Sequence, residues 1–275
     1  MRRILAPLCE PDLDRHALEL ATKLGSKLDA QVTALLPLTD FASLPVYGHY
    51  PMTVGWDELV QHSHGRAERR ETEVRQLLQE LGQGGNPDAP LKLRVQYGND
   101  DAVVSKAALT HDLVLFARQA SEDEDLSASS LLKTTLESSG RPVLVVTDDL
   151  APDFAGTVVI AWNGSVESAH AVTAALPLLT RAHKVHVLTF ATSRTDASAC
   201  EDVVAYLSCH GVKAQAHVHE PEGSVGEELL LEAERLSANL IVMGGYTHSR
   251  IRQTLFGGVT RHVLENGHVP LLMAR

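Results

Sequence analysis

Short apolar runs and longer amphipathic segments follow one another along the whole chain. Residues 240–243, LIVM, are apolar without alternation, which is typical of a parallel strand that is covered on both faces. Elsewhere Ala17, Leu20 and Leu24 recur at the spacing of one helix face. Because strand and helix alternate throughout, the pattern predicts an α/β fold with a parallel sheet, right-handed crossovers and helices on both faces.

The same pattern predicts where the strands and helices lie. It predicts strands at 3–8, 31–37, 91–97, 112–117, 142–147, 157–162, 184–190, 213–219, 238–244 and 269–273. It predicts helices at 12–27, 56–81, 101–109, 129–138, 165–179, 196–210, 225–237 and 255–265. Residues 39–55, rich in Pro, Gly and Tyr, are expected to form an irregular insertion, and residues 148–156 a short linker.

Two parts of the chain repeat each other. Residues 129–144 align with residues 257–272 without a gap, so that Leu136 meets Leu264 and Pro142 meets Pro270. The first strands, ILAP and VVIA, correspond in the same way. The repeat predicts two tandem domains, 1–148 and 156–275, each of ordinary domain size.

Composition narrows the classes of function. The chain has 275 residues, of which 44% are hydrophobic and 21% charged, as in a soluble globular protein. No apolar run approaches the roughly 18 to 20 residues that span a bilayer, and no signal-peptide core follows the first arginines. A net charge of -11 disfavours a nucleic-acid partner. We therefore expect a cytoplasmic protein without a membrane or nucleic-acid partner.

Cysteine and histidine patterns are weak signals here. Cys9, Cys200 and Cys209 are too widely spaced for a CxxC motif and are interpreted as packed, reduced thiols, with a redox role for Cys9 left open. Residues 217–219 and 62–64 each form a His-x-His pair, but no Cys or carboxylate completes a ligand set, so no metal site is predicted. A G-x-S-x-G elbow is absent, and no catalytic residue is proposed.

The segment 240–272 carries the main candidate chemistry. The strand at 240–243 ends at Gly244-Gly245, a basic loop with Arg250 follows, and a helix begins after Gly257-Gly258. Such a helix start presents backbone N–H groups to an anion. Ligands of parallel sheets bind beyond the carboxyl ends of the strands, so the strand ends at Ala161, Phe190 and Gly244 should converge on one crevice.

These segments, above all residues 156–179 and 244–264, resemble the universal stress protein family in its tandem form. The resemblance covers nearly the whole chain. It implies two Rossmann-like domains, each with a five-stranded parallel sheet of order 3-2-1-4-5, packed as an internal pseudo-dimer. It also implies a stress-response role and, in some members, an ATP site with the pattern G, two residues, G, nine residues, G, then S or T.

The second half keeps part of that pattern. Gly244 fits the first glycine and Gly257 the third, whereas Thr247 stands in place of the second and Gly258 in place of the Ser or Thr. A hydroxyl that bonds a charged phosphate contributes about 1.5 to 3 kcal/mol, so Gly258 is expected to weaken affinity roughly tenfold to a hundredfold.

The resemblance also assigns roles to other positions of the second half. Asn163 replaces the acid of the first strand and would reach the ribose or phosphates, Phe190 would pack the base, and Arg250 would screen charge. Asn163 has the alternative role of a helix cap near Ser165. The predicted site comprises Ala161, Asn163, Phe190, Gly244, Thr247, Arg250, Gly257, Gly258 and Val259. Its expected cofactor is ATP or another adenine nucleotide, with Mg as its companion.

The first half is the poorer candidate. Ala117 stands in place of the first glycine, and the carboxylates of residues 122–125 would lie where phosphates belong. Like charges repel strongly at a few ångströms, so this half is predicted to bind no nucleotide triphosphate and to supply a partner surface.

Two functions remain in competition at this point. The first is a ligand-binding regulatory module with ATP or a related nucleotide in its second half, which is no enzyme or at most a very slow ATPase. The second is a nucleotide-free scaffold in which residues 143–146 and 271–273 pair across the pseudo-dimer. Either can involve a homodimer or a regulatory protein partner.

Overall fold

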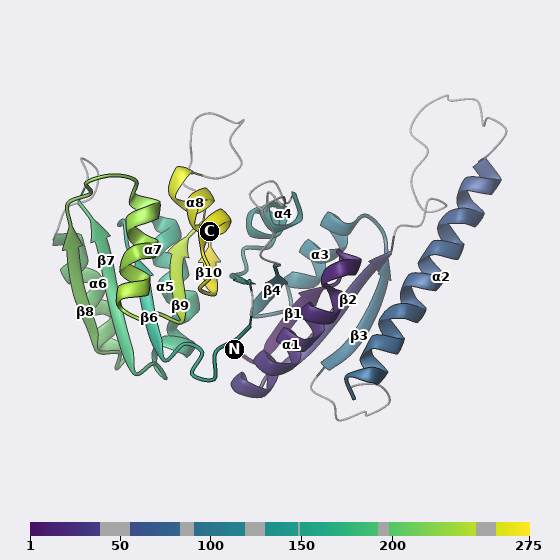
Figure 1. The fold of residues 1–275 in the computed structure, drawn as a ribbon, viewed down its shortest axis with the longest axis horizontal. Coiled ribbons are helices and arrows are strands. Elements are labelled where there is room, and N and C mark those ends of the chain that lie inside the picture. Colours follow the sequence, from purple (N-terminus) through teal and green to yellow (C-terminus); the bar gives the residue numbers. More distant parts are fainter. Residues whose placement is uncertain (39–55, 83–90, 119–129, 148, 192–197, 246–256) are drawn as a thin grey trace. The chain divides into compact units, whose positions relative to one another are not determined.

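The protein is an α/β protein, as the alternating pattern predicted. The structure, a computed structural model, describes residues 1–38, 56–82, 91–118, 130–147, 149–191, 198–245 and 257–275 (Figure 1). The chain forms two compact units, Met1–Leu115 and Phe116–Arg275. The domain limits 1–148 and 156–275, which come from the sequence repeat, stay a prediction. None of the described helices combines the length and the apolar character that crossing a bilayer requires.

The first unit is built on a parallel sheet in the order β3-β2-β1-β4. Ile4 pairs with Val32 on one side and with Leu113 on the other, so β1 is central. The elements are β1 (Arg3–Pro7), the short 3-10 helix η1 (Pro11–Leu13), α1 (Asp14–Leu28), β2 (Gln31–Leu38), α2 (Trp56–Glu80), β3 (Leu91–Tyr97), α3 (Asp100–Ala108) and β4 (Leu113–Ala117), whose end belongs to the second unit. This order is 3-2-1-4.

The second unit shows the expected order of five parallel strands. Its elements are α4 (Ser130–Ser139), β5 (Val143–Val146), β6 (Thr157–Ala161), α5 (Val166–Leu179), β7 (Lys184–Phe190), α6 (Ser198–Cys209), β8 (Ala214–His219), α7 (Val225–Arg235), β9 (Leu240–Gly244), α8 (Gly258–Asn266) and β10 (Leu271–Ala274). The order β8-β7-β6-β9-β10 is 3-2-1-4-5, counted from β6. The family resemblance is confirmed in this respect.

The last strand of the first repeat follows β4 in the strand order, as the order 3-2-1-4-5 predicted, and its other edge pairs with the second repeat. β5 groups with the second unit, where Leu144 pairs antiparallel with Leu272 of β10. The backbone N–H of Arg118, just after β4, donates to the carbonyl of Val146 at 2.8 Å. All four residues of β5 are buried, so this position removes its apolar side chains from water. The pairing of residues 143–146 with 271–273, which the scaffold hypothesis predicted, is therefore confirmed.

Helices cover both faces of the second sheet. In Figure 1, α7 and α8 lie in front of the strands, whereas α5 and α6 lie behind them. The LIVM run of β9 is fully buried, in agreement with its lack of alternation. α8 begins at Gly258, later than predicted, and residues 255 and 256 lie outside the described residues, as does the predicted irregular stretch 39–55.

An ion pair fixes the long helix α2 to α1. The buried face of α2 includes Ser63, Ala67, Val74 and Leu78, and Arg70 lies on the same stripe. The guanidinium of Arg70 pairs with the carboxylate of Asp14, whose side chain is 1% exposed. A charged residue is tolerated at this core-facing position because its partner is a buried carboxylate.

Breaking this pair should destabilise the first unit. We expect Arg70→Met to lower the free energy of unfolding by about 3–5 kcal/mol, because it leaves the Asp14 carboxylate buried without its cation. Chemical denaturation followed by circular dichroism measures the change. The matched control is Arg75→Met, since the Arg75–Glu71 pair is exposed and should contribute less than about 1 kcal/mol. A double change, Asp14→Leu with Arg70→Met, should recover most of the loss, and a double variant as unstable as Arg70→Met would contradict the explanation.

Candidate functional site

A pocket of about 510 Å³ lies at the carboxyl ends of β6, β7 and β9 in the second unit. Its walls come from these strand ends, from the turn that follows β6, and from the first turns of α7 and α8. The lining residues are Ala161, Trp162, Asn163, Gly164, Ser165, Leu188, Phe190, Val225, Leu229, Met243, Gly244, Gly257, Gly258, Val259 and Thr260. This is the edge at which ligands bind to doubly wound parallel sheets.

The pocket brings together most of the predicted site. Seven of the nine predicted residues line it, namely Ala161, Asn163, Phe190, Gly244, Gly257, Gly258 and Val259. Thr247 and Arg250 lie outside the described residues, so their positions stay predictions. Phe190 is 8% exposed and forms part of the wall without filling the cavity. The binding role of each residue is still a prediction.

Several wall residues were missed by sequence reasoning, although their spacing carried a signal. Leu188 stands two residues before Phe190 and therefore points to the same face of β7. Val225 and Leu229 stand four apart on α7 and share one face of that helix. These side chains make one side of the pocket apolar.

Side chains of the preceding turn form hydrogen bonds at the start of α5. Ser165 is the N-cap, and its hydroxyl oxygen accepts a hydrogen bond from the backbone N–H of Ser168 at 3.1 Å. The side-chain oxygen of Asn163 accepts from the N–H of Ser165 at 3.1 Å, and Gly164 between them has a φ of +71°. Ser165 rather than Asn163 therefore caps α5, whereas Asn163 holds the turn before the cap, where Gly164 suits the left-handed conformation.

The start of α8, in contrast, has no side-chain cap. Gly257 is its N-cap, in an extended conformation, and a glycine has no side chain that could accept a hydrogen bond from the first turn. At the other end of α8 the buried guanidinium of Arg118 donates to the carbonyl of Leu264 and to that of Glu265, the latter at 2.8 Å. At the end that lines the pocket, the first turn of α8 thus receives no cap from its N-cap residue, and its backbone N–H groups have the geometry that binds anions.

The glycines of the pocket serve different purposes. A Cβ on Gly244 would lie 2.7 Å from the backbone nitrogen of Ser168, so this glycine is required by the close approach of α5 to β9. A Cβ on Gly258 would meet no atom within 4 Å. Gly244 is thus explained by packing alone, whereas Gly258 leaves space beside the helix start.

No ionisable side chain is among the described residues of the wall. The positive potential at this end comes from the α8 N-terminus, and the carboxylates that hold Mg²⁺ in many nucleotide sites have no counterpart in that set. Thr260, two residues after the position where the family pattern has Ser or Thr, is buried in the first turn of α8 and lines the pocket.

In the first unit, the end of β1 is surrounded by ionisable side chains. Burial, with the nearby carboxylates of Asp100 and Asp14, raises the pKa of the Cys9 thiol far above its usual range. A redox role for Cys9 needs thiolate, so this environment argues against that alternative. Burial also raises the pKa of Asp14 to about 6, although Arg70 acts in the opposite direction. Ala117 ends β4, and the carboxylates of residues 122–125 lie outside the described residues.

A row of histidines lies on the strands beside the pocket. Nδ1 of His186 is 3.0 Å from Nε2 of His217, and the ring of His219 lies 5.6 Å from that of Phe190. Glu232 of α7 faces His219 at 4.0 Å. In the part of the chain that the structure describes, no group of three or more His, Cys, Asp or Glu residues is arranged to hold a metal ion.

Burial lowers the pKa of both histidines of the close pair. For His186 the charge of His217 adds to burial, and for His217 the charge of His219 does so. One ring must donate and the other accept in their hydrogen bond, so protonation of both would place two positive charges in contact.

Comparison with known proteins identifies a family for the second half. Residues 155–275 match the sequence model of the universal stress protein family. No curated protein matches the sequence significantly.

Solved structures resemble the whole chain. A universal stress protein from Archaeoglobus fulgidus DSM 4304 has a TM-score of 0.71 and 17% identity, covering 99% of this chain and 98% of that one. A functionally unknown protein from Pseudomonas aeruginosa PAO1 has a TM-score of 0.58 and 16% identity, covering 99% and 92%. At identities this low, the structural likeness shows a shared fold alone. A universal stress protein from A. fulgidus in complex with dAMP has a TM-score of only 0.34, with 18% identity, covering 42% of this chain and 93% of that one.

The histidine pair should make the second unit sensitive to acid. Because the folded pKa values of His186 and His217 are lowered, the unfolded chain binds more protons below about pH 6.5, and stability present above that pH is lost as the pH falls. We expect the denaturation midpoint to be lower at pH 5.5 than at pH 7.5, and the difference to shrink in His217→Gln. Exposed His268, changed to Gln, is the control. An equal pH dependence in wild type and His217→Gln would contradict this explanation.

Proposed function

We propose, because the chain belongs to the universal stress protein family over residues 155–275, that its second unit binds an adenine nucleotide and acts as a regulatory module. The observation that carries this proposal is the N-terminus of α8, whose N-cap Gly257 has no side chain to cap it, at a pocket of about 510 Å³. An anion is the natural ligand of such a helix start, and the volume suits a ligand of nucleotide size.

The two sides of the pocket suit the two parts of a nucleotide. Phe190, with Leu188 and Leu229, offers an apolar surface on which a base can pack. The phosphates would lie at Gly257 and Gly258, where the backbone can approach closely. This orientation extends the ligand from the β7 side of the crevice to the α8 side.

The polar contacts follow from this orientation. The amide of Asn163 lies at the strand end between the two sides and would reach the ribose or phosphates, while its oxygen also serves the turn to Ser165. The hydroxyl of Thr260 would donate to a phosphate from the first turn of α8. Arg250 and Thr247 belong to the proposed site through the sequence alone. Mg²⁺ would arrive with ATP, held by its phosphates, and we propose no more than slow hydrolysis.

A second candidate function has an observation of its own. The antiparallel pair of β5 and β10 joins the last strands of the two repeats, in the register Leu271–Val145, Leu272–Leu144 and Met273–Val143. This pairing supports a protein whose output is association with a regulatory partner or with a second copy, without nucleotide. Acid release of nucleotide from purified protein supports the first function, whereas absence of nucleotide and of any thermal shift in millimolar ATP supports the second.

Substitution of Gly258 tests the nucleotide proposal. We expect Gly258→Ser to fit without disturbing the fold and to strengthen ATP binding roughly tenfold, because it adds a hydroxyl at the helix start. Gly258→Glu should fold equally well but lose binding at least about tenfold, because a carboxylate would occupy the place of the phosphates. Isothermal titration calorimetry measures both. If the two variants bind ATP as wild type does, the phosphates do not lie at α8.

A further inference from the structure

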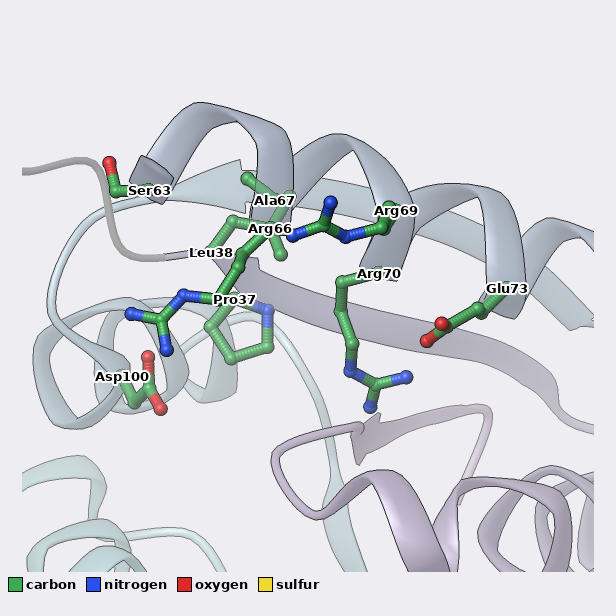
Figure 2. A pocket seen from close by; sticks show the side chains of 9 residues that line it. All are labelled: Pro37, Leu38, Ser63, Arg66, Ala67, Arg69, Arg70, Glu73 and Asp100. Atoms are coloured by element: carbon green, nitrogen blue, oxygen red, sulfur yellow. The ribbon is translucent and has the colours of Figure 1, made fainter. Parts of the chain in front are cut away.

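The first unit has a pocket of its own on a different helix. A cavity of about 420 Å³ lies where β2 ends at Pro37 and Leu38, beneath α2 and beside the start of α3. Three guanidiniums line it, from Arg66, Arg69 and Arg70, and we call it the arginine pocket (Figure 2). The rest of its polar wall is the hydroxyl of Ser63 and the carboxylates of Glu73 and Asp100.

The three arginines differ in their ion pairs. Arg69 and Arg70 stand three and four residues after Arg66 on α2, so each is a neighbour of Arg66 on the helix surface. Arg70 points toward α1 in Figure 2 and is held by Asp14, so its charge is already balanced. For Arg66 and Arg69, both exposed, no ion pair is recorded within the described ranges. Their two positive charges are thus available to a ligand.

The carboxylates of the wall restrict what the ligand can be. Asp100, the first residue of α3, lies on the side of the pocket to which the guanidinium of Arg66 extends, and Glu73 lies one helical turn beyond Arg70 (Figure 2). A carboxylate accepts hydrogen bonds from hydroxyl groups but repels a second or third phosphate. The side-chain oxygen of Asn99 caps α3 at 3.3 Å, so the helix start itself is not the anion site.

We propose that the arginine pocket binds a small phosphate monoester that also carries hydroxyl groups, as a sugar phosphate does. Arg66 and Arg69 would hold the phosphate, since the planar guanidinium matches phosphate oxygens with paired hydrogen bonds. Asp100 would accept from a hydroxyl, and Pro37, Leu38 and Ala67 would contact the carbon skeleton. This ligand class agrees with the prediction that the first half binds no nucleotide triphosphate.

The position of the pocket supports a ligand rather than chance solvation. It lies at the carboxyl end of a strand in a parallel sheet, where such folds bind ligands. Arg75, on the same helix, instead pairs with Glu71 through hydrogen bonds of 2.6 and 3.0 Å and does not line the pocket. Arg66 and Arg69 therefore differ from an ordinary surface arginine of α2 in both place and pairing.

Glucose 6-phosphate is a suitable probe, with inorganic phosphate and glucose as comparisons. Calorimetry on the full chain should detect the monoester, phosphate more weakly, and glucose not at all. We expect Arg66→Gln combined with Arg69→Gln to weaken binding of glucose 6-phosphate about tenfold to a hundredfold. The control Arg75→Gln should leave the affinity within about twofold, since Arg75 does not line the cavity and its ion pair is exposed. Asp100→Ala, which removes the acceptor of the hydroxyl, should bring the affinity for glucose 6-phosphate close to that for phosphate.

Three outcomes would overturn the proposal. They are no binding of glucose 6-phosphate at millimolar concentration, unchanged affinity in the double arginine variant, and equal affinity for phosphate and the monoester in wild type. Circular dichroism of each variant excludes misfolding as the cause of lost binding, and Arg70 is left intact because it supports the fold. ATP binding to the second unit should be the same in all these variants, so failure here is distinct from failure of the nucleotide proposal.

Discussion

The second unit depends on the close approach of α5 to the end of β9. At Gly244 the strand runs against the backbone of Glu167 and Ser168, so near that a single Cβ would lie 2.7 Å from a nitrogen atom. Any side chain there would push α5 away from the sheet. The turn at the end of β6, which leads directly into α5, would then move with it. The shape of the crevice between β6 and β9 therefore follows from one backbone contact.

That contact also shows which glycine of the pattern is needed for packing and which is free to serve a ligand. Gly244 satisfies the first position of the family's phosphate motif, yet a scaffold without any ligand would need it equally. Gly258 has no such packing reason, since the space beside it is open. The start of α8 is the stronger sign of a ligand, because the side chain of Ser165 caps α5, whereas the N-cap of α8 is a glycine without a side chain. Arg118 meanwhile satisfies carbonyls at the far end of α8.

The two halves of the chain differ in how they use charge. The described wall of the second pocket has no ionisable side chain and relies on a helix terminus. The first unit instead brings Asp14, Arg70 and Asp100 together near the end of β1, and burial there raises the pKa values of Cys9 and Asp14. A helix terminus favours any anion of suitable shape, whereas arginines opposed by carboxylates favour a ligand that also has hydroxyl groups. Duplication thus preserved the scaffold, and the side chains at the strand ends came to differ.

Much of the fold was predictable because apolar periodicity is local. The buried runs of β9 and β10, the helix stripe of α1 and the repeat of the Leu and Pro positions all reflect burial that each segment needs wherever it lies. The strand order could be predicted only through the family resemblance, because apolar periodicity does not say which strands are neighbours. The candidate site was predictable in part, since parallel strands end at one edge, so the ends at Ala161, Phe190 and Gly244 had to be neighbours.

By itself the sequence determined the α/β class, the duplication and most of the elements, because hydrophobic spacing and turn residues act within one segment. Only the tertiary structure decided that β5 and β10 pair antiparallel, that Asn163 holds the turn before α5, and that Val225 and Leu229 line the pocket. It alone placed Arg70 on Asp14 and Arg66 beside the end of β2. These contacts join residues far apart in sequence, and no local pattern specifies which distant side chain will satisfy a buried charge or an open helix end.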